Sequence, residues 1–157
     1  MQARSFYTAV VVLAALAIVL SIFLTYAHYA SADIACPRPT PGEKSGCDIV
    51  NKNIYAEMFG IPVAIIGLFG YTTIGALGLV GLGWLRPKGD LLDDIASRPA
   101  SYLMLLALGG FLFTLYLNYV QIFVIGRICF LCEISATIIT VILVISIILW
   151  LRERKRG

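Results

Sequence analysis

Four long apolar runs dominate the chain, and they constrain its fold more than any other feature. The runs cover residues 6–27, 59–85, 102–125 and 129–151. A helix needs roughly 20 apolar residues to cross a bilayer, and each run has about that length. Hydrophobic residues make up 60% of the chain and charged residues 13%, whereas a soluble domain carries about 25% charged residues. The sequence therefore predicts an all-α integral membrane protein, a bundle of four transmembrane helices in a single domain over residues 1–157.

The basic residues predict the orientation of this bundle. Four spans place both termini on one side, together with the loop between the second and third spans. The lysines and arginines on that side are Arg4, Arg86, Lys88, Arg98, Arg152, Arg154, Lys155 and Arg156, and those on the other side are Arg38, Lys44, Lys52 and Arg127. By the positive-inside rule, we expect a multi-pass protein of the cell membrane with cytoplasmic termini. The net charge of +3 comes mostly from the C-terminal tail, so it indicates topology and not a nucleic-acid partner.

All four cysteines fall on the extracytoplasmic side in this arrangement. Cys36 and Cys47 lie in the loop between the first and second spans, and Cys129 and Cys132 form a Cys-x-x-Cys motif that opens the fourth. The dipole of a helix favours a thiolate at its N-terminus. Two pairs on one face indicate either an oxidising compartment or redox catalysis, and all four cysteines are therefore candidate catalytic residues.

The polar segment 30–58 is predicted to be a redox loop. Three prolines and two glycines separate Cys36 from Cys47, and they forbid a helix there and favour turns. Such a loop can bring its two cysteines to disulfide distance. From Cys47 onward, apolar residues recur at near-helical spacing, which predicts a short amphipathic helix on the membrane surface.

The two cysteine pairs predict a relay of electrons. The loop pair would meet a partner protein and the helix pair would pass the electrons onward, each transfer being the attack of a thiolate on a disulfide. The sequence contains no haem motif and no GxGxxG, and a membrane-soluble quinone suits a dithiol at the edge of the bilayer. Because extracytoplasmic thiols tend to be oxidised, the expected activity makes disulfides.

Two other interpretations of the cysteines remain open. In the first, the chain is a structural four-span protein whose disulfides are staples. A staple between Cys129 and Cys132 would close nearly the shortest possible loop, although disulfide stabilisation grows with loop length. In the second, four thiolates bind zinc, but the Cys-x10-Cys spacing of the loop pair is wide for zinc ligands. We therefore predict no metal site.

The arrangement of these motifs resembles the vitamin K epoxide reductase family, most of all its bacterial and archaeal members. The resemblance covers essentially the whole chain, and the order of the two pairs is its specific part, because the other four-span thiol:quinone oxidoreductases carry Cys-x-x-Cys in the first outer loop. It rests on four spans, the loop cysteine pair, Cys47-Asp48-Ile49-Val50-Asn51, Phe59-Gly60-Ile61-Pro62 and Cys129-Phe130-Leu131-Cys132.

The resemblance implies a role for each cysteine. Cys36 and Cys47 would take electrons from a thioredoxin-like partner, Cys47 would attack Cys129, and Cys132 would lie beside a quinone enclosed by the four helices. The quinone would be a menaquinone, a ubiquinone or a vitamin K-like compound. Many bacterial relatives carry a thioredoxin-like domain after the fourth span. This chain ends at Gly157, so we expect a separate thioredoxin-like protein of the DsbA type.

Four further residues are candidate quinone contacts. Asn53 occupies a position where the family usually has Ser or Thr, and its amide can still form hydrogen bonds. Asn118 and Tyr119 are polar groups at membrane depth, beside Gln121, where such groups either bond between helices or contact a ligand. Glu133 follows the Cys-x-x-Cys motif, either as an acidic residue favoured in a first helical turn or as a group that handles protons.

One position leaves the substrate open. Animal members of the family have a tyrosine four residues beyond the second cysteine of the motif, and this chain has Ala136 there. The sequence therefore does not identify the quinone or decide whether an epoxide is also reduced.

Overall fold

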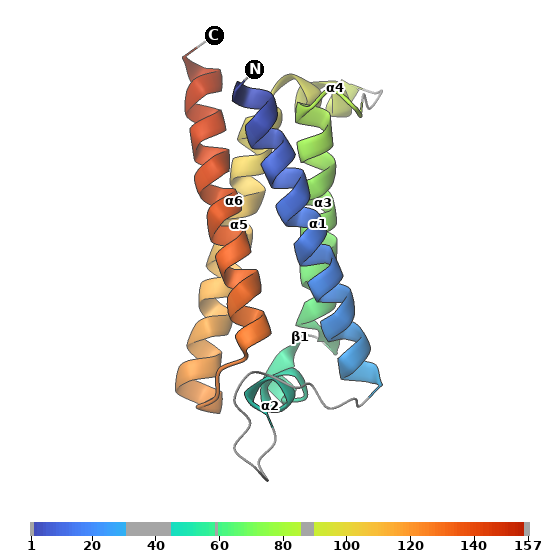
Figure 1. Cartoon of the computed structure of the whole chain (residues 1–157), viewed down its shortest axis with the longest axis vertical. Helices are drawn as coiled ribbons and strands as arrows, with labels where there is room; N and C mark the ends of the chain where they lie inside the picture. The colour runs from blue at the N-terminus through green and yellow to red at the C-terminus, as the bar shows by residue number, and fades with distance from the viewer. Residues whose placement is uncertain (1, 31–44, 59, 86–89, 156–157) are drawn as a thin grey trace.

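Four long helices run side by side along the chain's longest axis (Figure 1). The computed structural model describes residues 2–30, 45–58, 60–85 and 90–155. All four helices are long and apolar enough to cross a membrane, which confirms the predicted four-helix bundle. They are α1 (Gln2–Tyr29), α3 (Val63–Gly81), α5 (Pro99–Tyr119), which continues into the π-helical η2 (Val120–Ile125), and α6 (Phe130–Arg154).

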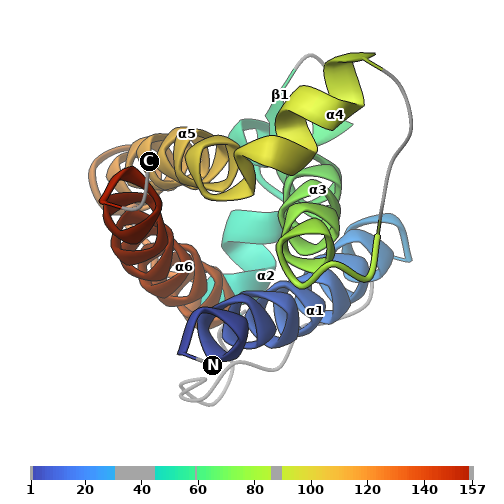
Figure 2. The same ribbon diagram turned by 90° about the horizontal axis from the view of Figure 1, so that it is seen from above.

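The helices form a ring in which α1 contacts α3 and α6, and α5 contacts the same two helices (Figure 2). The half of the ring nearest the termini is filled by a core of buried side chains that includes Val10, Leu103 and Ile142. Close approach of α1 and α3 depends on small residues: a Cβ atom at Gly81 would overlap the ring of Tyr7. The short helix α4 (Asp90–Ser97) lies at the same end as the termini.

The opposite end of the ring is covered by the chain that leads into α3 (Figures 1 and 2). We call residues 45–58 the cap segment. Its elements, together with the strand that follows, are α2 (Gly46–Asn51), the 3₁₀ helix η1 (Ile54–Ala56), β1 (Glu57–Met58) and β2 (Ile61–Pro62). Strand β1 pairs with β2 in antiparallel fashion, with Met58 opposite Ile61. Gly60 in the turn has a φ of +77°, which glycine adopts at little cost.

A short helix is present where the apolar spacing predicts one, but it is shorter than that spacing indicated. It ends at Asn51, because the side-chain oxygen of Asn53 accepts the N–H of Tyr55 at 3.1 Å and starts the 3₁₀ helix. Asparagine side chains compete in this way with a continuing α-helix. The second span likewise begins at Val63 and not at residue 59, because Ile61 and Pro62 pair with β1.

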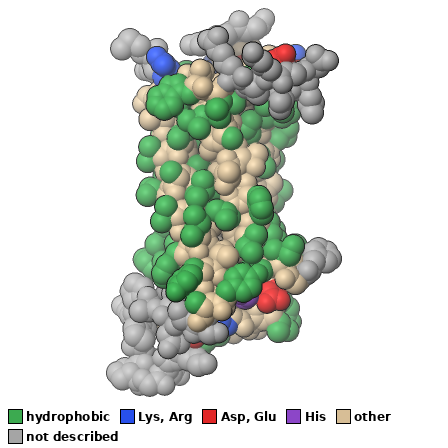
Figure 3. Space-filling model, turned by 90° about the vertical axis from the view of Figure 1, so that its right-hand side faces the viewer, with side chains coloured by type: hydrophobic (Ala, Val, Ile, Leu, Met, Phe, Trp, Pro, Cys, Tyr) green, Lys and Arg blue, Asp and Glu red, His purple; other side chains and the backbone are tan. Residues whose placement is uncertain are grey.

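The outer surface of the bundle fits a membrane. Hydrophobic side chains extend along the sides of the molecule, whereas the described charged side chains gather near its two ends (Figure 3). A helix that presents apolar residues outward over its whole length is typical of a membrane span. The protein is therefore a multi-pass membrane protein.

Candidate redox site

The Cys-x-x-Cys motif forms the N-terminus of α6. Cys129 is the N-cap of the helix, and its sulfur accepts the backbone N–H of Cys132 at 3.3 Å. Both residues are free thiols, with Cys129 fully buried and Cys132 partly buried. The hydrogen bond from the Cys132 thiol lowers the pKa of Cys129, and the backbone N–H groups of Cys132 and Leu131 lower it further, although burial and the charge of Glu133 oppose them. Cys129 is therefore the favoured thiolate of the pair.

Cys47 belongs to the same buried cluster as Cys129. Both side chains are fully buried in one cluster with Leu24, Ala27 and Val50. Gly46 makes this approach possible, because a Cβ atom there would overlap the carbonyl oxygen of Ile128. Cys47 is disulfide-bonded, while the predicted catalytic Cys36 lies outside the described residues.

A cavity of about 330 Å³ occupies the half of the ring under the cap segment. This volume falls within the range of small-molecule sites, roughly 300–1,000 Å³. Its walls come from all four long helices, η2 and the cap segment, and most of the lining is apolar. Cys132 lines the cavity, whereas Cys129 and Cys47 are not among the described residues that line it. Cys132 therefore has access to the cavity, whereas Cys129 is a fully buried member of the cluster that contains Cys47, and Cys132 packs against the edge of that cluster.

A few polar groups interrupt the apolar lining. Asn118 and Gln121 line the cavity from α5 and η2, and the side-chain nitrogen of Gln121 donates to the side-chain oxygen of Asn118 at 3.3 Å. On the facing helices, the hydroxyl of Tyr71 bonds to the hydroxyl of Ser135 at 2.8 Å. An apolar pocket with a few convergent polar groups is typical of a small-molecule binding site.

Comparison with known protein families gives a match over most of the chain. Residues 8–147 match the model of the Vitamin K epoxide reductase family. The chain belongs to the vitamin K epoxide reductase family. Membership makes it a membrane oxidoreductase that acts on quinone or epoxide substrates, in a family that generally works with thioredoxin-like partners.

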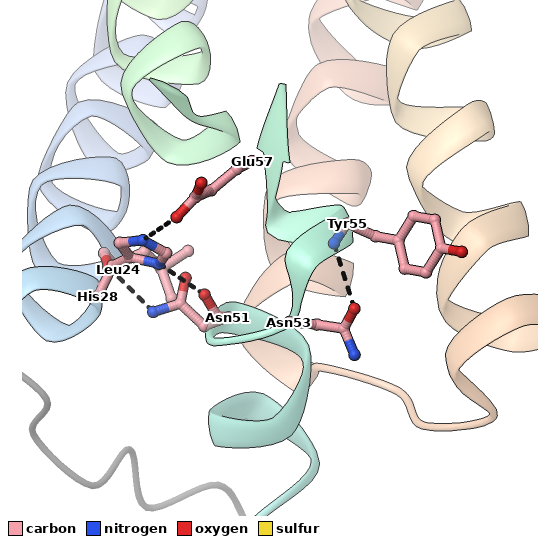
Figure 4. A network of polar contacts seen from close by, with 6 residues as sticks. All are labelled: Leu24, His28, Asn51, Asn53, Tyr55 and Glu57. Atoms are coloured by element: carbon pink, nitrogen blue, oxygen red, sulfur yellow. Dashed lines mark hydrogen bonds and ion pairs between the residues drawn. The ribbon is translucent and has the colours of Figure 1, made fainter. Parts of the chain in front are cut away.

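Only one of the four candidate quinone contacts in this family member lines the cavity, and that residue is Asn118. Tyr119 points away, with 58% of its surface exposed, and packs on Phe123. Asn53 caps η1 (Figure 4). Glu133 lies in the first turn of α6 and is partly buried, but it is not among the lining residues either.

Sequence reasoning missed Tyr71 and Ser135. Both stand inside apolar runs, where a serine hydroxyl can bond to its own helix and the sequence does not show which way either side chain faces. Only the packing of α3 across the ring from α6 brings the two hydroxyls together. The polar cluster at Asn118 and Gln121 did carry a signal, because amides at membrane depth need partners.

His28 fastens the cap segment to the end of α1 (Figure 4). Its Nδ1 lies 2.7 Å from the backbone oxygen of Asn51, and its Nε2 lies 3.2 Å from the Glu57 carboxylate. The side-chain nitrogen of Asn51 donates in turn to the backbone oxygen of Leu24 at 3.2 Å. These bonds hold the cap segment over the cavity, so the role of His28 is structural.

Proposed function

We propose that the protein is a disulfide-forming thiol:quinone oxidoreductase. Electrons from a separate thioredoxin-like protein enter at Cys36 and Cys47, pass to Cys129 and Cys132, and reduce a quinone in the cavity. The observation that carries this proposal is the division of the Cys-x-x-Cys motif. Cys132 lines the cavity, while Cys129 and Cys47 are both fully buried in one cluster, so the motif adjoins both of the neighbours that a relay needs.

The first internal step is thiol–disulfide exchange. The Cys47 thiolate attacks Cys129 of the Cys129–Cys132 disulfide and releases Cys132 as a thiolate; Cys36 then attacks Cys47, which closes the outer disulfide and frees Cys129. Two electrons move inward and no other reactant is consumed. A disulfide at Cys47 beside free thiols at Cys129 and Cys132 is the arrangement that this exchange would leave.

The second step returns the inner pair to its disulfide. The dithiol of Cys129 and Cys132 gives up two electrons and two protons, and a quinone that accepts them becomes a quinol. The S–S bond forms between Cys129 and Cys132 as the electron pair passes to the quinone, and the lowered pKa of Cys129 favours the deprotonated sulfur that this step needs. The mostly apolar lining suits a menaquinone, a ubiquinone or a vitamin K-like ring.

The orientation follows from charge. Among the described residues, Cys47, Cys129 and Cys132 belong to the end of the bundle opposite the termini (Figure 1). Eight of the twelve basic residues fall on the side of the termini in the count given above. We infer that the termini are cytoplasmic and that the cysteines meet an extracytoplasmic partner.

The test measures how many quinone molecules are reduced for each disulfide formed in the partner. The protein is reconstituted in lipid vesicles with a reduced thioredoxin-like protein and menadione, and partner thiols and quinone absorbance are followed together. We expect one quinone reduced per disulfide formed, complete loss of both in Cys132→Ser, and retention of both in Thr140→Ser, an exposed position on the same helix. Partner oxidation that continues in Cys132→Ser, or without quinone reduction, would overturn the proposal. Vitamin K epoxide supplied in place of menadione tests the alternative substrate.

A further inference from the structure

Gln121 joins the cysteine loop to the cavity through two hydrogen bonds. Its side-chain oxygen accepts the backbone N–H of Cys129 at 2.9 Å, and its side-chain nitrogen donates to the side-chain oxygen of Asn118 at 3.3 Å. The side chain is only 3% exposed. A buried amide with both ends bonded has one defined orientation.

The π-helical turn η2 explains how these groups meet. The backbone oxygen of Gln121 accepts the N–H of Arg127 at 3.1 Å, and Gly126 closes the turn with a φ of +68°. The chain therefore folds back on Gln121 directly before Cys129.

The backbone N–H of Cys129 determines the direction of every bond in this chain of contacts. A backbone N–H can only donate, so the Gln121 oxygen must face Cys129 and the Gln121 nitrogen must face Asn118. Asn118 then accepts through its oxygen, which leaves its NH₂ group as the free end. Within the part of the chain that the structure describes, this NH₂ group has no hydrogen-bond partner, and Asn118 lines the cavity.

We propose that Gln121 is a positioning residue that orients Asn118, so that the Asn118 NH₂ group donates to a carbonyl oxygen of the bound quinone. This inference rests on the proposed function and assigns a donor to its quinone site. Bonds that all point the same way polarise one another. A donor aimed at an oxygen that gains negative charge during reduction stabilises the transition state more than the starting quinone.

The arrangement gives the two cysteines of the motif separate routes to the same cavity. Cys132 reaches it with its own sulfur, and Cys129 reaches it through its backbone N–H and two amides. A bound quinone would therefore help to hold the loop that carries Cys129. Gln121 itself does not touch the reacting atoms.

A double-mutant cycle tests the inference. The reduction of menadione is measured with dithiothreitol as the reductant in the unsubstituted protein, Gln121→Met, Asn118→Leu and the double variant. We expect each single substitution to lower kcat/KM about tenfold, the value of one hydrogen bond, and the double variant to match Asn118→Leu alone. The control cycle pairs Gln121→Met with Ser135→Ala, because Ser135 lines the cavity but does not bond to Gln121 or Asn118. The effects of these two substitutions on kcat/KM should multiply.

Infrared spectra of bound menadione give a second readout that needs no turnover. A donor to the carbonyl lowers its stretching frequency, so the frequency should be lowest in the unsubstituted protein and equal in Asn118→Leu and the double variant. Gln121→Asn, which retains an amide but is one methylene shorter, is the second variant if Gln121→Met does not fold. Effects that multiply at Gln121 and Asn118, or an unchanged kcat/KM in Gln121→Met, would overturn the inference. Absence of menadione reduction by the unsubstituted protein would overturn the proposed function, and this inference with it.

Discussion

Gly46 packs directly against the carbonyl oxygen of Ile128, with no space between them for a Cβ atom. Each of these residues immediately precedes a cysteine, Cys47 in the cap segment and Cys129 at the start of α6. The backbone contact therefore brings the two sulfur atoms into one buried cluster. In the relay proposed here, this contact sets how closely the outer and inner pairs approach.

Substitution of Gly46 by alanine should slow the exchange between the two pairs. Since the obstacle is a backbone oxygen and not a flexible side chain, the start of α2 must move away from the Cys129 loop. We expect quinone reduction driven by the thioredoxin-like partner to fall at least tenfold. Reduction driven by dithiothreitol, which can reduce the inner pair directly, should fall much less.

Gly75→Ala is the matched control for this substitution. It also adds one methyl group, but that Cβ atom would lie 3.5 Å from the Cβ of Ala14, an ordinary contact. Both activities should stay near those of the unsubstituted protein. Equal partner-driven rates in the two alanine variants would show that the contact at Gly46 does not govern exchange.

Much of the fold could be predicted from hydrophobicity alone, and the site only in part. The length and composition of the apolar runs predict the four spans, because a bilayer accepts few other structures. The positions of Cys47, Cys129 and Cys132 follow from the same topology. The cap segment was less predictable. The capping bond of Asn53 and the short β pairing after it replace a continuing helix, and the spacing of apolar residues does not indicate either of them.

The orientation of a polar side chain was the least predictable property of the site. Tyr119 and Asn118 are neighbours in the sequence, yet one points outward and the other lines the cavity. A helix rotates about 100° per residue, and an apolar run gives little indication of which face meets lipid. Tyr71 and Ser135 went unpredicted for the same reason.

The thiolate of Cys129 should persist at lower pH than that of an ordinary cysteine, whose pKa is about 8.5. The hydrogen bond from the Cys132 thiol is the largest cause of the lowered pKa, and the charge of Glu133 opposes it. Cys132→Ala removes the hydrogen-bond donor and should therefore raise the pKa of Cys129 above its value in the unsubstituted protein. Glu133→Gln removes the opposing charge and should lower the pKa of Cys129 below that value.

Thiolate absorbance near 240 nm measures this titration in protein lacking Cys36 and Cys47, with Cys129→Ser as the blank. The pKa of Cys129 is lower in the folded protein than in the unfolded chain. The thiolate therefore contributes its full stabilisation of the fold at any pH above the ordinary thiol pKa. It is lost as the pH falls through the folded-state value. A Cys129 that titrates at or above about pH 8.5 would contradict the assignment of this residue as the thiolate.

Loss of the His28 side chain should loosen the cap segment. His28→Ala removes the contacts to the Asn51 backbone and the Glu57 carboxylate. We expect amide hydrogen exchange in Gly46–Met58 to accelerate by about tenfold, a modest effect because Glu57 is partly exposed to solvent.

Thr25→Val, one turn earlier on α1, is the control for the cap. The Thr25 hydroxyl bonds to the backbone oxygen of Ser21 within its own helix, so its loss should leave exchange in the cap segment unchanged. If His28→Ala and Thr25→Val gave the same exchange rates, His28 would not be the residue that fastens the cap.

The central claim is that Cys129 exchanges with Cys47 while Cys132 serves the cavity, and a trapped disulfide tests it most directly. In Cys132→Ser, the Cys129 thiolate has no resolving partner, so its attack on the outer disulfide should stop at a Cys47–Cys129 bond with Cys36 released as a thiol. Peptide mapping by mass spectrometry, without reduction, identifies the linked cysteines. We expect a Cys47–Cys129 crosslink in Cys132→Ser and none between Cys47 and Cys132 in Cys129→Ser; the reverse pattern would show that Cys132, and not Cys129, exchanges with Cys47.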